Sequence, residues 1–153
     1  MKIELKNISK SFKKEKVLDD ISYTFNEKRI YGIVGANGSG KSVLLKVLAG
    51  LYKASRGELL FDGKNYQQEK IFPHFIGAAI EYPGFMNDLT GWENLLLLAG
   101  IKKIIGKEEI NEILEVVGLS KDKDKKYGTY SLGMRQKLSL AQALMEKPLV
   151  ILL

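Results

Sequence analysis

Eight consecutive residues carry the most recognisable chemistry in this chain. From residue 35 to residue 42 they read Gly-Ala-Asn-Gly-Ser-Gly-Lys-Ser, a full match to the pattern G-x-x-x-x-G-K-[ST]. Glycines let the backbone curl with its N–H groups pointing inward, which forms a nest for an anion. Lys41 can then reach the β- and γ-phosphates of a nucleotide, and the Ser42 hydroxyl can ligate Mg²⁺. We therefore predict a phosphate-binding loop made of Gly35, Ala36, Asn37, Gly38, Ser39, Gly40, Lys41 and Ser42.

The residues on either side of this loop predict the elements that hold it. The apolar run at residues 30–34 is typical of a strand buried on both faces. After the loop, leucines recur at helical spacing, and Gly50 suits the end of that helix. These leucines are Leu44, Leu45, Leu48 and Leu51. The alternative is a glycine-rich turn with an incidental lysine, but strand, loop and helix in this order favour a phosphate site.

The composition limits the classes of protein that fit. The chain has 153 residues, enough for one domain with its own core, and its 45% apolar and 27% charged content is that of a soluble globular protein. It lacks cysteine, which excludes disulfides and thiolate metal sites and fits a reducing, cytosolic compartment. The N-terminus has no signal-peptide pattern, and the longest apolar run, near Leu95–Ile101, is far shorter than the roughly 20 residues that span a bilayer.

The net charge of +6 comes almost entirely from lysines that are spread along the chain. A nucleic-acid binder more often gathers arginines and aromatic residues on one face, so we expect no nucleic-acid partner. The densest lysines, at residues 121–126, alternate with aspartates and predict a solvated loop. A weak attraction to phosphates or to an anionic membrane surface stays open.

Periodicity predicts the remaining elements. Residues 2–8 and 17–25 read as two strands joined by a polar turn at residues 11–14, which suggests an antiparallel sheet beside the nucleotide site. A strand and turn follow at residues 58–63, the segment 65–75 is ambiguous, and residues 76–80 read as a buried strand that ends at Glu81 before a break at Pro83-Gly84.

Helical patterns dominate the second half of the chain. A capping box at residues 90–93 opens one helix that continues through Leu98. A second helix is predicted at residues 108–117 with Gly118 as its stop. A third is predicted at residues 133–147, ended by Pro148, and an apolar strand at residues 149–153 follows it.

A second constellation lies 90 residues beyond Lys41, where residues 130–144 read YSLGMRQKLSLAQAL. Together with the phosphate loop, this stretch resembles the ATP-binding domains of ABC transporters, whose signature is L-S-G-G-Q followed by a basic helix and an apolar strand. Ser131 and Gly133 match the serine and the second glycine, whereas Tyr130, Leu132 and Met134 depart from the pattern. The S-L-G-M form is similar to the bacitracin- and lantibiotic-type exporter ATPases. The resemblance covers essentially the whole chain.

The resemblance implies roles for single residues. Phe12 lies where the family places an aromatic ring that stacks on adenine; an ordinary packing ring is the alternative. Glu81 falls at the Q-loop position, where the usual glutamine touches Mg²⁺ and the attacking water; a simple charge at a strand end is the alternative. The resemblance thus makes Lys41 and Glu81 the catalytic candidates and Ser42 and Glu81 the metal ligands. His74 is expected to be a loop histidine without a catalytic role, and Trp92 a packing residue rather than a membrane-domain contact.

The resemblance also concerns the end of the sequence. In the family, an Asp that holds Mg²⁺ and a Glu that polarises the attacking water follow the strand that here ends at Leu153. Residues 1–153 therefore look like the N-terminal part of an ABC-type nucleotide-binding domain, with a helical subdomain at approximately 85–130. As such they are expected to be poorly soluble and inactive as an ATPase on their own.

We therefore expect an α/β P-loop NTPase fold of the ABC ATPase type, with an N-terminal antiparallel subdomain and a helical insert, incomplete at the C-terminus. The resemblance implies ATP and Mg²⁺ as cofactors and two partners, a transmembrane permease subunit and a second ATP-binding domain in a head-to-tail dimer. It also implies ATP-driven export, with a peptide antibiotic as one candidate cargo, from a cytoplasmic position on the inner face of the membrane. Two alternatives stay open: a soluble ABC-type ATPase of translation or DNA repair, and a truncated module that binds nucleotide without turnover.

Overall fold

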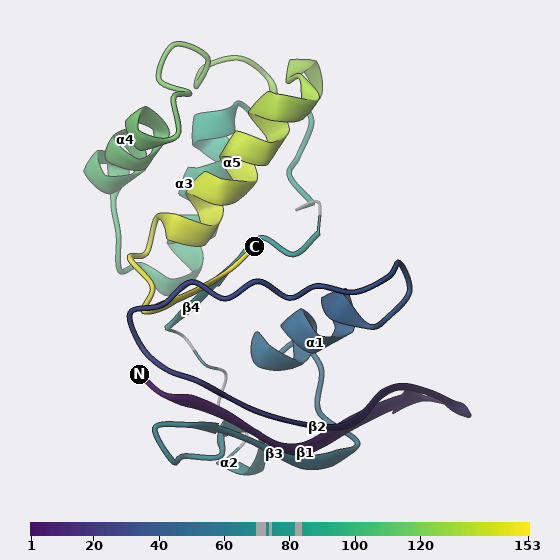
Figure 1. Cartoon of the computed structure of the whole chain (residues 1–153). Coiled ribbons are helices and arrows are strands. Elements are labelled where there is room, and N and C mark those ends of the chain that lie inside the picture. The colour runs from purple at the N-terminus through teal and green to yellow at the C-terminus, as the bar shows by residue number, and fades with distance from the viewer. Residues whose placement is uncertain (70–72, 74, 82–83) are drawn as a thin grey trace. The chain divides into compact units, whose positions relative to one another are not determined.

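The described residues form one three-stranded antiparallel sheet, one parallel pair of short strands, and helices (Figure 1). The computed structural model describes residues 1–69, 73, 75–81 and 84–153. The chain divides into two units, residues 1–74 (unit 1) and residues 75–153 (unit 2). His74 and Pro83, two residues singled out in the sequence, lie outside the described residues.

Unit 1 is built on the strands β1 (Ile3–Phe12), β2 (Glu15–Phe25) and β3 (Arg56–Phe61), in the order β2-β1-β3. Both pairings of β1 are antiparallel, which confirms the predicted antiparallel sheet. Alternation buries Ile3 and Leu5 on one face of β1, as a half-buried strand requires. The predicted turn at residues 11–14 is shorter than expected, because Ser11 and Phe12 still pair with β2.

Two adjacent aspartates, Asp19 and Asp20, lie within β2 and produce an irregularity rather than a break in the strand. Asp20 has a positive φ of 51°, and the β1–β2 register shifts on either side of Ile8. The Asp20 N–H donates to Ser9 Oγ at 3.0 Å, and Asn7 Nδ2 donates to Asp20 Oδ1 at 2.8 Å. Side chains thus replace the ladder bonds that a bulge removes, so the strand continues through it.

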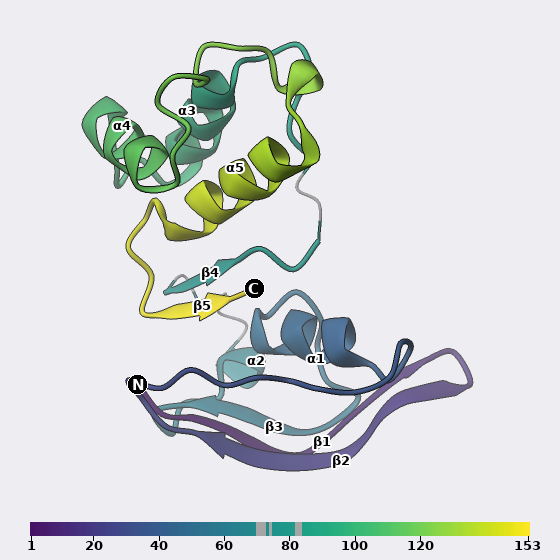
Figure 2. The ribbon, with the colours of Figure 1, turned by 45° about the horizontal axis from the view of Figure 1, so that its top comes forward.

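The helix α1 (Lys41–Leu48) lies on one face of this sheet (Figure 2), and Leu44, Val47 and Leu48 are its buried residues. It ends as predicted at Gly50, whose φ is +76°. The N–H groups of Gly50 and Leu51 donate to the carbonyls of Val47 and Lys46, which is a Schellman closure. Leu51 was expected on the buried face, but it follows the helix end and is 57% exposed. A short helix, α2 (Tyr66–Glu69), follows β3.

The strand predicted at residues 30–34 is wrong. This segment joins neither sheet of the described residues, Ile30 is fully exposed and Val34 is 95% exposed. Burial on both faces comes from partner strands and covering helices, and apolar composition alone supplies neither. The segment is held locally instead, because the Asn26 N–H donates to the Tyr31 hydroxyl at 2.8 Å and Tyr31 packs edge-on against Phe25.

Unit 2 contains β4 (Ile76–Ala78) and β5 (Val150–Leu152), which pair in parallel although they are far apart in sequence. Both strands are therefore present, each shorter than expected, and β4 is half-buried rather than buried as predicted. The helix α5 (Leu132–Leu144) packs on β4 so closely that a Cβ on Gly77 would collide with the Ala143 carbonyl. Ile151 is exposed, so β5 is not covered on both faces.

The other helices of unit 2 are α3 (Gly91–Lys102), α4 (Lys107–Val116) and the 3-10 turn η1 (Tyr127–Thr129). With α5 they enclose a core in which Leu95, Ile110 and Leu138 are fully buried. The predicted capping box is confirmed: Glu93 N–H donates to Thr90 Oγ1 at 3.1 Å, and Thr90 N–H donates to Glu93 Oε2 at 2.7 Å. The stop at Gly118 is confirmed by its φ of +69°. Trp92 packs against this core, as expected for a packing residue.

Candidate functional site

The loop at residues 35–40 leads directly into α1, and its shape depends on glycine. Gly40 is the N-cap of α1 with a φ of +89°, a left-handed conformation that L side chains rarely adopt. A Cβ at Gly40 would also lie 2.9 Å from the Val17 carbonyl oxygen and 2.9 Å from a Leu18 methyl group. Gly40 is thus required both by its backbone angle and by the close approach of the loop to β2.

The Lys41 side chain folds back over this loop. Its ammonium donates two hydrogen bonds of 2.8 Å, one to the Gly35 carbonyl and one to the Ala36 carbonyl. The Ser39 N–H also turns back to the Ala36 carbonyl, at 3.2 Å. In the described structure no side chain caps the N-terminus of α1, which leaves the positive end of the helix dipole uncompensated. The Lys41 ammonium lies at the loop that leads into this helix end. A phosphate group suits this arrangement.

Ser42 lies exposed in the first turn of α1, next to Lys41. A hydroxyl together with phosphate oxygens and water suits Mg²⁺, which prefers oxygen ligands and keeps part of its hydration shell. Among residues 1–69, 73, 75–81 and 84–153, no three His, Cys, Asp or Glu residues cluster as metal ligands. Glu81, the second ligand expected from the resemblance, is exposed and follows β4 in unit 2. The joint metal role of Ser42 and Glu81 stays a prediction.

Phe12 lies in the same unit as the loop, at the last position of β1, and 38% of its surface is exposed. Strand pairing links this end of β1 to the loop. Lys10 of β1 pairs with Leu18 of β2, and Leu18 is one of the residues that Gly40 of the loop approaches. The Phe12 ring meets the Tyr52 ring edge-to-face, with 5.3 Å between ring centroids and 71° between planes. An aromatic ring with an accessible surface is therefore available in the same unit as the phosphate loop.

The predicted Ser131–Gly133 corner opens α5 in unit 2. Ser131 is the N-cap of α5, and its Oγ accepts a hydrogen bond from the Met134 N–H at 3.3 Å. Gly133 is exposed, and among the described residues a Cβ built on it would meet no atom within 4 Å other than those of its neighbours and its own helix backbone. The packing of this chain therefore gives no reason for glycine at position 133, where alanine would favour the helix.

Arg135 and Tyr130 support this corner, and sequence reasoning assigned neither a role. The Arg135 guanidinium donates to the Gly128 carbonyl at 3.3 Å and to the Tyr130 carbonyl at 3.2 Å, and it lies 5.1 Å from the Tyr127 ring centroid. The buried Tyr130 hydroxyl donates to the Asp122 carbonyl at 2.8 Å. Burial, with the charges of Asp122 and Asp124, raises the pKa of Tyr130. The only hint in the sequence was the pair Tyr127 and Tyr130, three residues apart, just before the start of α5.

The comparisons with known proteins agree with this arrangement. The chain belongs to the ABC transporter family, whose sequence model matches residues 18–153. It is 40% identical over 153 residues to the ABC transporter ATP-binding protein YhcH of Bacillus subtilis, covering 99% of this chain and 50% of that protein. It is 38% identical to the bacitracin transport ATP-binding protein BcrA of Enterococcus faecalis, covering 99% of this chain and 49% of that protein. The chain thus spans about half the length of these relatives, and the bacitracin-type subgroup is supported.

Solved structures confirm the α/β fold of an ABC ATPase cassette. A dimeric bacterial ABC transporter cassette matches with a TM-score of 0.84 at 28% identity, covering 97% of this chain and 72% of that chain. A nucleotide-free ATP-binding cassette of an ABC transporter matches with a TM-score of 0.81 at 30% identity, covering 99% of this chain and 68% of that chain.

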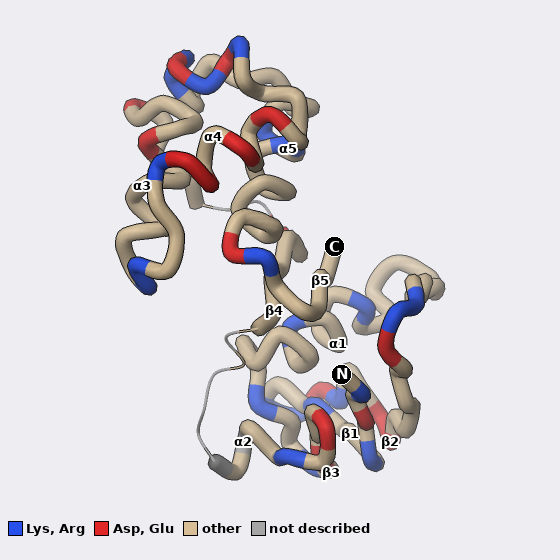
Figure 3. The backbone as a smooth tube through the Cα atoms, turned by 90° about the vertical axis from the view of Figure 1, so that its left-hand side faces the viewer, with Lys and Arg blue, Asp and Glu red and all other residues tan. Residues whose placement is uncertain are grey.

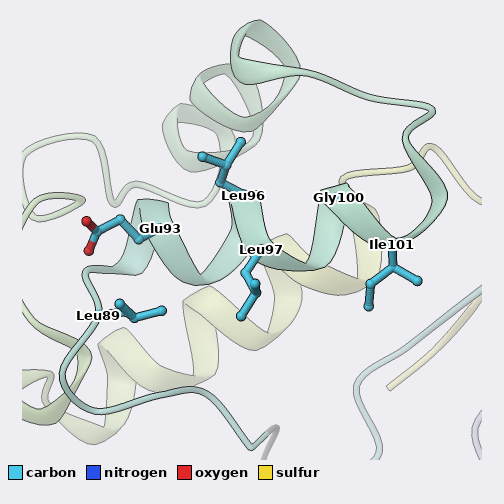
Figure 4. Close-up of a pocket in the computed structure, with 6 residues that line it drawn as sticks. All are labelled: Leu89, Glu93, Leu96, Leu97, Gly100 and Ile101. Atoms are coloured by element: carbon cyan, nitrogen blue, oxygen red, sulfur yellow. The ribbon is translucent and has the colours of Figure 1, made fainter.

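Two surface features complete the description. Unit 1 carries 14 of the 24 basic residues and only 8 of the 18 acidic ones, so the whole net charge of +6 belongs to the unit with the phosphate loop. Figure 3 marks the charged residues that the structure describes along the backbone. In unit 2, an apolar groove runs along α3 (Figure 4). It is lined by Leu89, Glu93, Leu96, Leu97, Gly100 and Ile101. No helix in the described residues is long and apolar enough to cross a membrane.

Proposed function

We propose that this chain binds ATP with Mg²⁺ and forms part of an ATP-binding subunit of an ABC transporter. The observation that carries the proposal is the loop at residues 35–42, where the Lys41 ammonium and the N-terminus of α1 converge on one bend. The positive charge of unit 1 supports it, because ATP is a polyanion. In this reading the loop amides and Lys41 hold the phosphates, Ser42 supplies one oxygen to Mg²⁺ and Phe12 stacks on the adenine.

Equilibrium binding of Mg-ATP to a matched pair of variants tests this proposal. Lys41→Ala should abolish ATP retention without loss of the fold, because Lys41 acts as a point charge on phosphate and is not a core residue. Lys6→Ala removes the same charge from an exposed position on β1 and should bind like the unmutated chain. ATP affinity in Lys41→Ala equal to that of Lys6→Ala would contradict the proposal.

For the signature corner we propose a role in a head-to-tail dimer, in which Ser131 and Gly133 of one chain meet the γ-phosphate held by the loop of the other. The bare surface at Gly133 supports this, because a glycine that no contact within the chain requires leaves room for a close approach from outside. The Ser131 hydroxyl accepts from Met134 and still has its own proton to donate. The helical residues near 85–130 would form the subdomain that carries this corner.

We propose further that the full protein hydrolyses ATP and couples it to export through a separate permease, from the cytoplasmic face of the membrane. The bacitracin transport relatives support a role in transport, and export is the direction that we propose. The apolar groove on α3 is our candidate for the permease contact. Glu81 would act beside the metal. Residues 1–153 alone are expected to bind ATP without turnover, because the family's two catalytic carboxylates follow the strand that corresponds to β5. Mg²⁺-dependent phosphate release from residues 1–153, lost in Lys41→Ala, would overturn that expectation.

A further inference from the structure

We propose that Tyr52 is a positioning residue that holds the Phe12 ring ready for the base of the nucleotide. This inference rests on the proposed ATP site and adds a residue that neither the phosphate-loop pattern nor the signature points to. It is drawn from a cluster of two rings and two lysines in unit 1, which we call the Tyr52 cluster. The cluster consists of Lys10, Phe12, Lys46 and Tyr52.

The backbone at Tyr52 is fixed by the end of α1. The N–H groups of Leu51 and Tyr52 both donate to the Lys46 carbonyl, at 2.9 Å and 3.1 Å. The Lys46 ammonium lies 5.3 Å from the centroid of the Tyr52 ring. Tyr52 is therefore held at the C-terminal end of α1, the helix that begins at the phosphate loop. Its ring contact with Phe12 links this helix to the end of β1.

The Lys10 ammonium contacts both the Phe12 ring and the Tyr52 ring. It lies 5.0 Å from the Phe12 centroid and 5.5 Å from the Tyr52 centroid, and it donates to the Lys53 carbonyl at 2.7 Å. Because the two centroids are 5.3 Å apart, the three groups form a nearly equilateral triangle. Lys10 and Tyr52 therefore both restrict the Phe12 ring, while 38% of the Phe12 surface stays exposed. We infer that this exposed surface is where the base stacks.

This arrangement matters because Phe12 is the last residue of its strand. The next residue, Lys13, turns away with a φ of +53°, and the Phe12 ring is partly exposed. A ring in that position must give up rotamer freedom when a base stacks on it, which weakens binding. An edge-to-face partner and a cation at the ring restrict those rotamers before the base arrives. Tyr52 thus favours stacking without contact to the base itself.

The ratio of the affinities for Mg-ATP and for inorganic triphosphate tests this inference on the full chain. The ratio isolates the contribution of the base and ribose, because both ligands engage the phosphate loop. Tyr52→Leu should lower the ratio about two- to tenfold, the scale of one aromatic pair, and leave triphosphate affinity unchanged. Tyr52→Phe should restore the ratio, because the edge-to-face contact does not need the hydroxyl. Tyr66→Leu, which removes a comparable tyrosine contact with Phe61 elsewhere in unit 1, should leave the ratio unchanged.

The outcomes separate this inference from the proposed function. If the unmutated chain binds neither ligand, the proposed function fails and this inference fails with it. If Phe12→Ala lowers the ratio but Tyr52→Leu does not, the ATP site stands and the role of Tyr52 is refuted. If Tyr52→Leu does not fold, Tyr52→Met carries the test: it also removes the ring and keeps a long apolar side chain, it should lower the same ratio, and an unchanged ratio overturns the inference.

Discussion

The Lys41 ammonium lies 2.8 Å from the carbonyl oxygen of Gly35, six residues earlier in the chain. This hydrogen bond closes the phosphate loop on itself and places a positive charge at the bend where α1 begins. A phosphate that enters the loop must draw the ammonium from two carbonyl acceptors, and it offers charged oxygens in exchange. We therefore propose that the Lys41 ammonium, which bonds to two loop carbonyls here, is also the group that binds the phosphate.

Gly40→Ala should destabilise the chain by about 1–2 kcal/mol, because it forces a left-handed backbone on an L residue. The added Cβ would in addition press on the Val17 carbonyl. Urea unfolding measures the change. Gly100→Ala is the matched control, because Gly100 lies in the last turn of α3 and, among the described residues, no atom outside its own helix lies within 4 Å of an added Cβ. It should not destabilise the chain and should stabilise it by at most about 1 kcal/mol. Equal stability of the two variants would contradict the account of the loop.

Gly133→Ala should separate stability from function. Gly133 is the second residue of α5 and has open space around it, so alanine should raise the free energy of unfolding, by less than the roughly 0.8–1.0 kcal/mol of a helix interior. The same methyl group should block the close approach of a second chain and reduce ATP-dependent dimerisation, measured by light scattering with and without Mg-ATP. A variant that is more stable and dimerises normally would refute the proposed role of the corner.

The capping carboxylates of α3 and α4 predict an acid-dependent stability. The backbone N–H groups of Thr90 and Gly106 donate to Glu93 and Glu109, and these hydrogen bonds hold the pKa of each carboxyl below its ordinary value of 4.5. A lowered pKa in the folded state stabilises the chain at pH values above 4.5. That contribution is lost as the pH falls through the folded pKa.

Urea unfolding between pH 7 and the acid range measures this dependence. The double variant Glu93→Gln, Glu109→Gln should show a shallower loss of stability in acid, because glutamine accepts the same hydrogen bonds without titrating. Glu112→Gln, at an exposed position of α4, is the control and should follow the unmutated chain. An unchanged acid dependence in the double variant would show that these carboxylates do not carry it.

Local signals predicted most of the fold well. The capping box at Thr90, the glycine stops at Gly50 and Gly118, and the alternation at Ile3 and Leu5 depend on neighbours within a few residues, and all four are confirmed. Long-range signals did less well. The run at residues 30–34 has the composition of a buried strand, yet a strand is defined by partners that composition does not name.

The candidate site divides in the same way. The loop from Gly35 to Ser42 was predictable because a continuous segment supplies its charge, its glycines and its helix start. Tyr52 and Arg135 were missed because their roles depend on residues brought close only by folding, Phe12 for Tyr52 and the turn at Tyr127 for Arg135. No pattern along the sequence marks a ring after a helix that supports another ring at the end of a strand.

Amide hydrogen exchange on the full chain, with and without Mg-ATP, tests the central claim most directly. The N–H groups at residues 35–42 should bind phosphate oxygens, so Mg-ATP should slow exchange in peptides that cover this loop and the first turn of α1. Peptides that cover α4 should exchange at the same rate in both conditions, and Lys41→Ala should lose the protection at the loop. Slower exchange elsewhere with none at residues 35–42 would contradict the assignment of this loop as the nucleotide site.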